Sequence, residues 1–164
     1  NLENIISINL SFSCEVIVGG KIGFCSGEGE EDCCGGFAVG FHGFPRGTKD
    51  IDFLVDASTE NILKIKTALS YLPENAIREM QETDVEKYNV VRVADDFVID
   101  LMAKACSISY EQAKDDVDIY EIDDVEIPIA SKHLLIRTKN TIRPSDKMDV
   151  DFLKAAIAEE NRKK

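Results

Sequence analysis

The chain has 164 residues, is 44% hydrophobic and 30% charged, and carries a formal net charge of −12 at pH 7. Such a length suits one domain, which buries roughly 70% of the surface that the unfolded chain exposes. No apolar run approaches the roughly 18 residues of a membrane span, and the acidic charge argues against a general nucleic-acid binder. The first residues, NLENIISINLSF, lack the basic and long apolar segments of a secretory signal, so we expect a cytoplasmic protein.

Residues 13–34 have no clear hydrophobic period and hold most of the five cysteines. The cysteine spacings contain no C-x₂-C pair of the kind found in zinc sites, so reduced thiols are expected. Three interpretations of this segment stay open. It is a glycine-rich loop over a ligand, a flexible insertion, or the product of an altered reading frame. For the last, a shifted frame of residues 12–27 can encode an amphipathic helix that runs into a strand.

Two elements are predicted in the first part of the chain after the glycine pair. Residues 37–43, FAVGFHG, are expected to form a short helix in which His42 is packed and is not a base. Residues 59–72 are expected to form an amphipathic helix, with Ser58 as its cap and Pro73 as its stop. The apolar residues that recur on one face of this helix are Ile62, Ile65, Leu69 and Leu72.

Strands and shorter helices are predicted in the second half. Residues 85–102 are rich in β-branched residues and interrupted by Asp95-Asp96, which indicates two strands joined by a tight turn. Ser109 and Gln112 have the spacing of a capping box at the start of a short helix. Residues 119–130 indicate a hairpin that turns at positions 123–124.

Two helices are predicted to end the chain. Ser131 caps a helix over residues 132–140, and a final helix begins near Ser145. Its buried face is expected to consist of Val150, Leu153 and Ile157. Because strands and helices are mixed without regular alternation, we expect an α/β (α+β) fold, a mixed sheet with helices packed on it, in a single domain without a linker.

Two short motifs suggest chemistry. Asp50 and Asp52 stand at positions i and i+2 of an expected strand, so both carboxylates point to one face. Such carboxylates repel each other unless a cation lies between them, and their oxygens suit Mg2+ or Mn2+. Gly35-Gly36 would let the backbone approach a phosphate, which the N–H groups of the following helix could bind. Each motif alone is common in turns and on solvated strands, but the combination predicts a nucleoside-triphosphate site.

The same stretch resembles the signature of the DNA polymerase β-like nucleotidyltransferase superfamily, in which an apolar-Gly-Gly/Ser motif precedes Asp-apolar-Asp/Glu-apolar. The sequence GGFAVGFHGFPRGTKDIDFLVD is similar to that of small bacterial nucleotidyltransferases, including those of toxin–antitoxin and abortive-infection systems. The similarity extends from about residue 35 to 155. Residues 13–34 depart from it, since the family has a helix and a strand that lead into the glycines. The tail motif of that branch is matched by Lys139, Arg143, Asp146 and Asp149.

The resemblance implies roles for particular residues. Gly35 and Gly36 would hold the nucleotide phosphates, and Asp50 and Asp52 would bind two divalent cations. The family takes a third carboxylate from a later strand. Asp100 fits that role, because a buried-strand aspartate requires a cation or hydrogen bonds, and it could also accept the proton of the attacking hydroxyl.

Three cationic residues are further candidates for nucleotide binding. Arg46 and Lys49 lie between the glycines and the aspartates, where a cation would stabilise triphosphate charge. Lys139 would reach the nucleotide from its helix. For all three, an ordinary solvated side chain is the alternative.

The implied activity is a Mg2+-dependent nucleotidyl transfer, in which an acceptor hydroxyl attacks the α-phosphorus in line and pyrophosphate leaves. The acceptor is a protein, a tRNA end or a small molecule, and the acidic charge favours a protein or small molecule over RNA. A toxin–antitoxin partner protein is also implied by the resemblance. Two alternatives stay open: a non-enzymatic, antitoxin-like or regulatory subunit that keeps the fold, and a metal-binding or nucleotide-sensing module without turnover.

Overall fold

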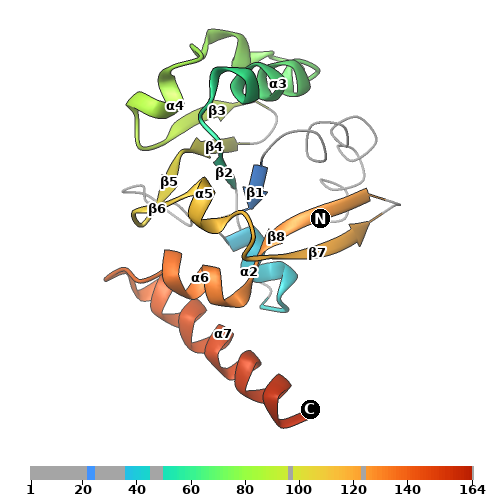
Figure 1. Cartoon of the computed structure of the whole chain (residues 1–164), viewed down its shortest axis with the longest axis vertical. Coiled ribbons are helices and arrows are strands. Elements are labelled where there is room, and N and C mark those ends of the chain that lie inside the picture. The colour runs from blue at the N-terminus through green and yellow to red at the C-terminus, as the bar shows by residue number, and fades with distance from the viewer. Residues whose placement is uncertain (1–21, 25–35, 45–49, 96–97, 123–124, 164) are drawn as a thin grey trace.

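The computed structural model describes residues 22–24, 36–44, 50–95, 98–122 and 125–163 (Figure 1). Six strands form one sheet in the order β3-β4-β2-β1-β8-β7. A separate two-stranded sheet contains β5 and β6. The strands are β1 (Ile22–Phe24), β2 (Asp50–Val55), β3 (Val91–Ala94), β4 (Val98–Met102), β5 (Lys104–Ala105), β6 (Ile108–Ser109), β7 (Val117–Ile122) and β8 (Val125–Ala130).

The sheet is mixed, as the sequence predicts. Strands β2 and β4 are parallel, as are β1 and β8, whereas β3–β4, β1–β2 and β7–β8 are antiparallel. The helices are α2 (Gly36–Phe41), α3 (Thr59–Leu69), the 3₁₀-helix η1 (Ala76–Glu79), α4 (Asp84–Lys87), α5 (Tyr110–Ala113), α6 (Lys132–Thr138) and α7 (Pro144–Lys163). The predicted α+β class is therefore confirmed.

Helices cover both faces of the central strands. Figure 1 shows α3 and α4 on one side of the sheet and α2, α6 and α7 on the other. Because strand residues alternate between faces, neighbouring positions enter different cores. Leu54 and Met102 belong to the core with α2, α6 and α7, whereas Val55 and Leu101 belong to the core with α3, η1 and α4. We call these the α7-side core and the α3-side core.

Helix α3 confirms the prediction for residues 59–72 in its position and its buried face. Ile62 and Ile65 are fully buried in the α3-side core. The helix ends at Leu69, before the predicted stop at Pro73. Ser58 occupies the cap position, but its side chain makes no capping bond; its backbone N–H donates to Asp56 Oδ1 at 3.0 Å instead.

The stretch 85–102 contains the two predicted strands, β3 and β4, but its first residues are helical. Helix α4 starts at Asp84, and the carboxylate of Asp84 accepts from the backbone N–H of Gln81 at 2.7 Å. This local hydrogen bond favours a turn over a strand. The prediction of extended structure from Val85 was therefore wrong for this first turn.

The two predicted caps and the β7–β8 pairing are confirmed. Gln112 Oε1 accepts from the backbone N–H of Ser109 at 2.9 Å, which completes the capping box of α5. Ile122 pairs with Val125, so β7 and β8 form the predicted hairpin; the predicted turn positions, 123–124, lie outside the described residues. Ser131 Oγ accepts from the Leu134 N–H at 3.1 Å and caps α6.

Helix α7 begins one residue before the predicted Ser145, and its buried face differs from the predicted one. Leu153 is fully buried, but Val150 and Ile157 are only half-buried. The other buried positions are Asp146 and Asp149. Two carboxylates thus occupy the face that was expected to be apolar, because they contact a buried lysine described below.

A short strand lies within the irregular segment 13–34. Strand β1 pairs with β2 and β8 in the centre of the sheet. The other residues of this segment, to which the three interpretations (a loop over a ligand, an insertion or an altered reading frame) apply, lie outside the described part of the chain. None of the helices in that described part is long and apolar enough to cross a membrane.

Candidate functional site

The two aspartates of the D-x-D motif open strand β2 and share one sheet face. Asp50 and Asp52 are followed on that face by Leu54, which is buried in the α7-side core. The Asp52 side chain is also buried, at 2% exposure, and the Asp50 side chain is 12% exposed. The carboxylates therefore lie on the sheet face that packs against the α7-side core, at the start of β2.

Asp100 lies directly beside this pair. Strands β2 and β4 run parallel with Asp52 opposite Asp100, so the two side chains share a face. Asp100 is 2% exposed, and Met102 follows it on the same face in the α7-side core. The structure thus brings together the three carboxylates that the sequence predicted as ligands.

Arg92 from strand β3 completes this row of side chains and was missed by the sequence analysis. It stands opposite Asp100 and binds it with two hydrogen bonds, Nε to Oδ1 at 2.9 Å and Nη2 to Oδ2 at 2.8 Å. The same Nη2 lies 3.6 Å from Asp50 Oδ2. The sequence held no signal for this contact: the predicted tight turn at 95–96 would set position 92 opposite 99, whereas the observed pairing of Ala94 with Val98 sets it opposite 100.

Helix α2 packs on the sheet face that carries the carboxylates. The predicted helix after the glycines is confirmed, and Gly36 is its buried first residue. Phe37, Ala38 and Val39 lie in the α7-side core with Leu54. The start of α2 and the D-x-D motif are therefore on the same side of the sheet. Gly35, Arg46 and Lys49, the other predicted site residues of this region, lie outside the described residues.

Lys139 is placed in the interior at the junction of α6 and α7. Its side chain is 0% exposed, and Nζ lies 2.8 Å from Asp149 Oδ2 and 3.4 Å from Asp146 Oδ1. Asp146 Oδ2 also accepts a hydrogen bond from the Thr141 hydroxyl. The ammonium group is thus committed to two carboxylates, and a role in nucleotide binding stays a prediction.

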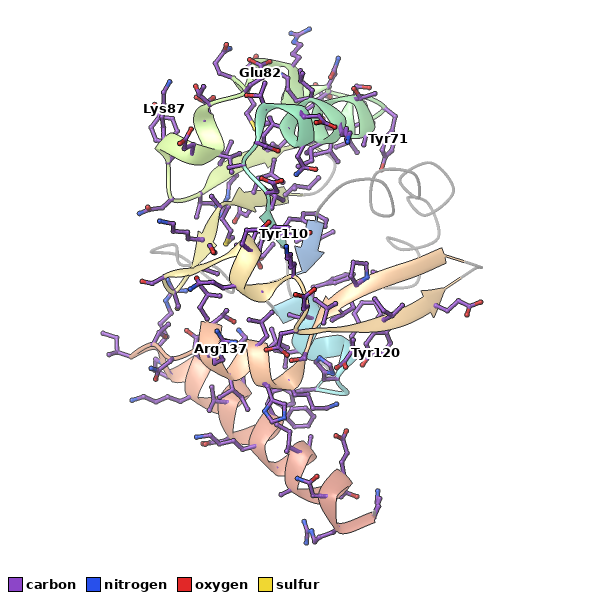
Figure 2. All side chains as sticks on the ribbon, viewed as in Figure 1. Tyr71, Glu82, Lys87, Tyr110, Tyr120 and Arg137 are labelled. Atoms are coloured by element: carbon purple, nitrogen blue, oxygen red, sulfur yellow. The ribbon has the colours of Figure 1, made fainter. Side chains whose placement is uncertain are left out.

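His42 is packed, as expected. It is 9% exposed, and its Nε2 donates to the Ala130 carbonyl at 2.8 Å. Since a carbonyl only accepts, Nε2 carries the proton and Nδ1 is left to accept from the Tyr120 hydroxyl at 3.2 Å. Tyr120, labelled in Figure 2, lies on strand β7, and its ring is 5.3 Å from that of Phe41.

Burial sets the protonation state of this pair. It lowers the pKa of His42, against the opposing effect of the Ala130 hydrogen bond. Burial also raises the pKa of Tyr120, so its hydroxyl keeps the proton that it donates. The neutral imidazole bridges α2 and the β7–β8 hairpin, which is a structural role.

A cavity of about 270 Å³ lies away from the carboxylates, between α4 and the β5–β6 turn. Its lining includes Tyr88, Lys104 and Cys106, and no predicted site residue that the structure describes. Cys106 has a free thiol that donates to the Thr138 carbonyl at 2.8 Å. The other four cysteines lie outside the described residues.

The donor chemistry of the carboxylate row fits a hard divalent cation, since Asp50, Asp52 and Asp100 offer only oxygen ligands. Within the described part of the chain, however, no three acidic, histidine or cysteine side chains are already arranged around a common point for a metal ion. Asp100 instead faces the Arg92 guanidinium. Cation binding at this row therefore requires side-chain rearrangement.

Comparisons with known proteins do not identify a family or a function for this chain. No family model matches the chain, and a search of curated proteins finds no match either.

Proposed function

We propose that the protein is a Mg2+-dependent nucleotidyltransferase with a nucleotidyltransferase-type sheet. One observation carries the proposal: Asp50, Asp52 and Asp100 share one sheet face, with Asp52 directly opposite Asp100. Three carboxylates in such a row are costly to bury without a cation. The motif resemblance supports the same assignment, because it implies these three positions.

The carboxylate row would hold Mg2+ or Mn2+ through Asp50, Asp52 and Asp100. When bound, the cations would neutralise charge on the triphosphate and polarise the α-phosphorus for attack. The nucleotide phosphates would approach the sheet next to Gly36, where α2 begins on the carboxylate side. A glycine at this position carries no side chain that would hold phosphate oxygens away from the backbone.

A side chain of the protein, Asp100, would accept the proton of the attacking hydroxyl. The acceptor hydroxyl attacks the α-phosphorus, the bond to the pyrophosphate leaving group breaks, and the hydroxyl proton passes to Asp100. Both Asp100 oxygens bind Arg92, so this carboxylate must release at least one of those hydrogen bonds to act as a base. The acceptor is a protein, a tRNA end or a small molecule, and the net charge of −12 favours a protein or a small molecule over RNA.

A second candidate is a non-enzymatic, antitoxin-like or regulatory subunit that keeps the fold. The observation that favours it is the Arg92–Asp100 pair, because a guanidinium already neutralises the third carboxylate without a metal. A nucleotide-sensing module without turnover differs from the first proposal only in its lack of pyrophosphate release.

Calorimetry with each of the four ribonucleoside triphosphates, with and without Mg2+, tests the proposal. We expect Mg2+-dependent binding of at least one triphosphate by the wild type and its loss in Asp52→Asn. Asp151→Asn, a change of an exposed aspartate on α7, is the matched control and should bind like the wild type. Absence of binding for every triphosphate would favour the non-enzymatic subunit, and binding without pyrophosphate release on any acceptor would favour the sensing module.

A further inference from the structure

We propose that Arg92 holds the place of a metal ion: its guanidinium offsets part of the carboxylate charge, at Asp100 and Asp50, in the metal-free protein and competes with divalent cations for these two ligands. This inference rests on the proposed function, since it concerns the same carboxylates. It adds a residue that neither the D-x-D motif nor the resemblance points to. Its consequence is that the protein binds its cation more weakly than its carboxylates alone would allow.

The contacts of Arg92 define the competition. Nε and Nη2 bind the two oxygens of Asp100 at 2.9 and 2.8 Å, and Nη2 also lies 3.6 Å from Asp50 Oδ2. One guanidinium thus spans two of the three predicted metal ligands. A divalent cation that used the same oxygen lone pairs would meet repulsion from this positive charge.

Arg92 can leave the row without opening the core. Strand β3 is an edge strand of the sheet, and the Arg92 side chain is 52% exposed, whereas that of Asp100 is 3% exposed. The guanidinium therefore reaches the buried carboxylate from the solvent side. Movement of the guanidinium away from Asp100 would therefore expose a side chain that is already half exposed, while the neighbouring Val93 remains buried in the α3-side core.

The electrostatics explain why a placeholder is needed. Asp52 and Asp100 are both 2% exposed and stand opposite each other on paired strands. Two such carboxylates destabilise the folded chain unless positive charge is close. In the metal-free protein Arg92 supplies positive charge at Asp100 and Asp50, and a divalent cation would supply it in the loaded protein.

Titration calorimetry with Mn2+ alone tests this inference on the wild type, Arg92→Gln, Arg92→Lys and Asp52→Asn. Loss of a bidentate charged contact predicts that Arg92→Gln binds Mn2+ about ten-fold more tightly than the wild type. Arg92→Lys keeps the charge but not the bidentate geometry and should fall between the two. Asp52→Asn should lose binding. Arg137→Gln is the matched control, because Arg137 (labelled in Figure 2) also pairs with an aspartate, Asp116, at 3.4 Å.

Thermal unfolding with and without Mn2+ provides the second readout. Metal-free Arg92→Gln should unfold at a lower temperature than the wild type, and Mn2+ should raise its midpoint more than it raises that of the wild type. If Arg92→Gln does not fold, the order of Mn2+ affinities of Arg92→Lys and the wild type decides.

The outcomes separate this inference from the proposed function. Wild-type binding with equal or weaker binding by the Arg92 variants would overturn the placeholder role and leave the metal site standing, because Arg92 would then orient the ligand and not compete for it. Absence of Mn2+ binding by the wild type and by every Arg92 variant would overturn the metal site and this inference together.

Discussion

Lys139 and Asp149 form an ion pair that is sealed from solvent: Nζ and Oδ2 are 2.8 Å apart, and the side chains are 0% and 1% exposed. Asp146 Oδ1 lies 3.4 Å from the same ammonium group. One buried cation therefore faces two carboxylates. This contact joins the end of α6 to the first turns of α7.

Lys139→Met should lower the free energy of unfolding by about 3–5 kcal/mol, because it removes the buried cation that both Asp149 and Asp146 face. Asp149→Asn should cost less, since Lys139 keeps Asp146 as a partner. Urea denaturation of both variants measures the difference. Lys154→Met, at an exposed position of α7, is the control and should change stability little. A larger loss for Asp149→Asn than for Lys139→Met would contradict the described charge balance.

His42 should make stability depend on pH. Its folded-state pKa is lowered by burial below the unfolded value of 6.5, so the unfolded chain binds the proton more readily. The stability that depends on neutral His42 is fully present above pH 6.5. It is lost as the pH falls from 6.5 through the folded-state pKa.

His42→Gln tests this pH dependence, because glutamine can still donate to the Ala130 carbonyl but does not titrate. Urea midpoints measured between pH 5 and pH 8 should fall less steeply towards acid in this variant than in the wild type. Parallel profiles for the two proteins would show that other groups dominate in this range.

Asp95 should stabilise the start of η1. Its Oδ1 accepts from the Glu74 N–H at 3.1 Å and its Oδ2 from the Ala76 N–H at 3.2 Å. Asp95→Ala should cost about 1–2 kcal/mol, the usual effect of removing a cap. Asp115→Ala, an exposed aspartate in a turn, is the control. Equal urea midpoints for the two variants would contradict a capping role.

Leu54 should contribute strongly to stability, because it is buried in the α7-side core on the same face of β2 as Asp50 and Asp52. It is 1% exposed, and Leu54→Ala should lower the free energy of unfolding by about 2–5 kcal/mol. Leu63→Ala changes a leucine that is 49% exposed and should cost much less. Chemical denaturation of both variants provides the comparison.

The sequence by itself determined the features that depend on neighbours within a few residues. Ser131 caps α6, Gln112 closes the capping box of α5, and β7 and β8 pair as a hairpin. The common face of Asp50 and Asp52 also follows from local geometry, because strand side chains alternate with a period of two. These predictions hold because no distant residue is needed for them.

Only the tertiary structure decided which charges meet. Arg92 faces Asp100 because of the exact register of the β3–β4 pair, and a shift of one residue would give Asp100 another partner. The predicted apolar face of α7 was wrong for the same kind of reason. Asp149 is buried there because Lys139 arrives from α6, and a carboxylate can leave water only where the fold brings a cation to it. Helical periodicity predicts which side chains of one helix share a face, but it does not predict which charged residue of another element packs against that face.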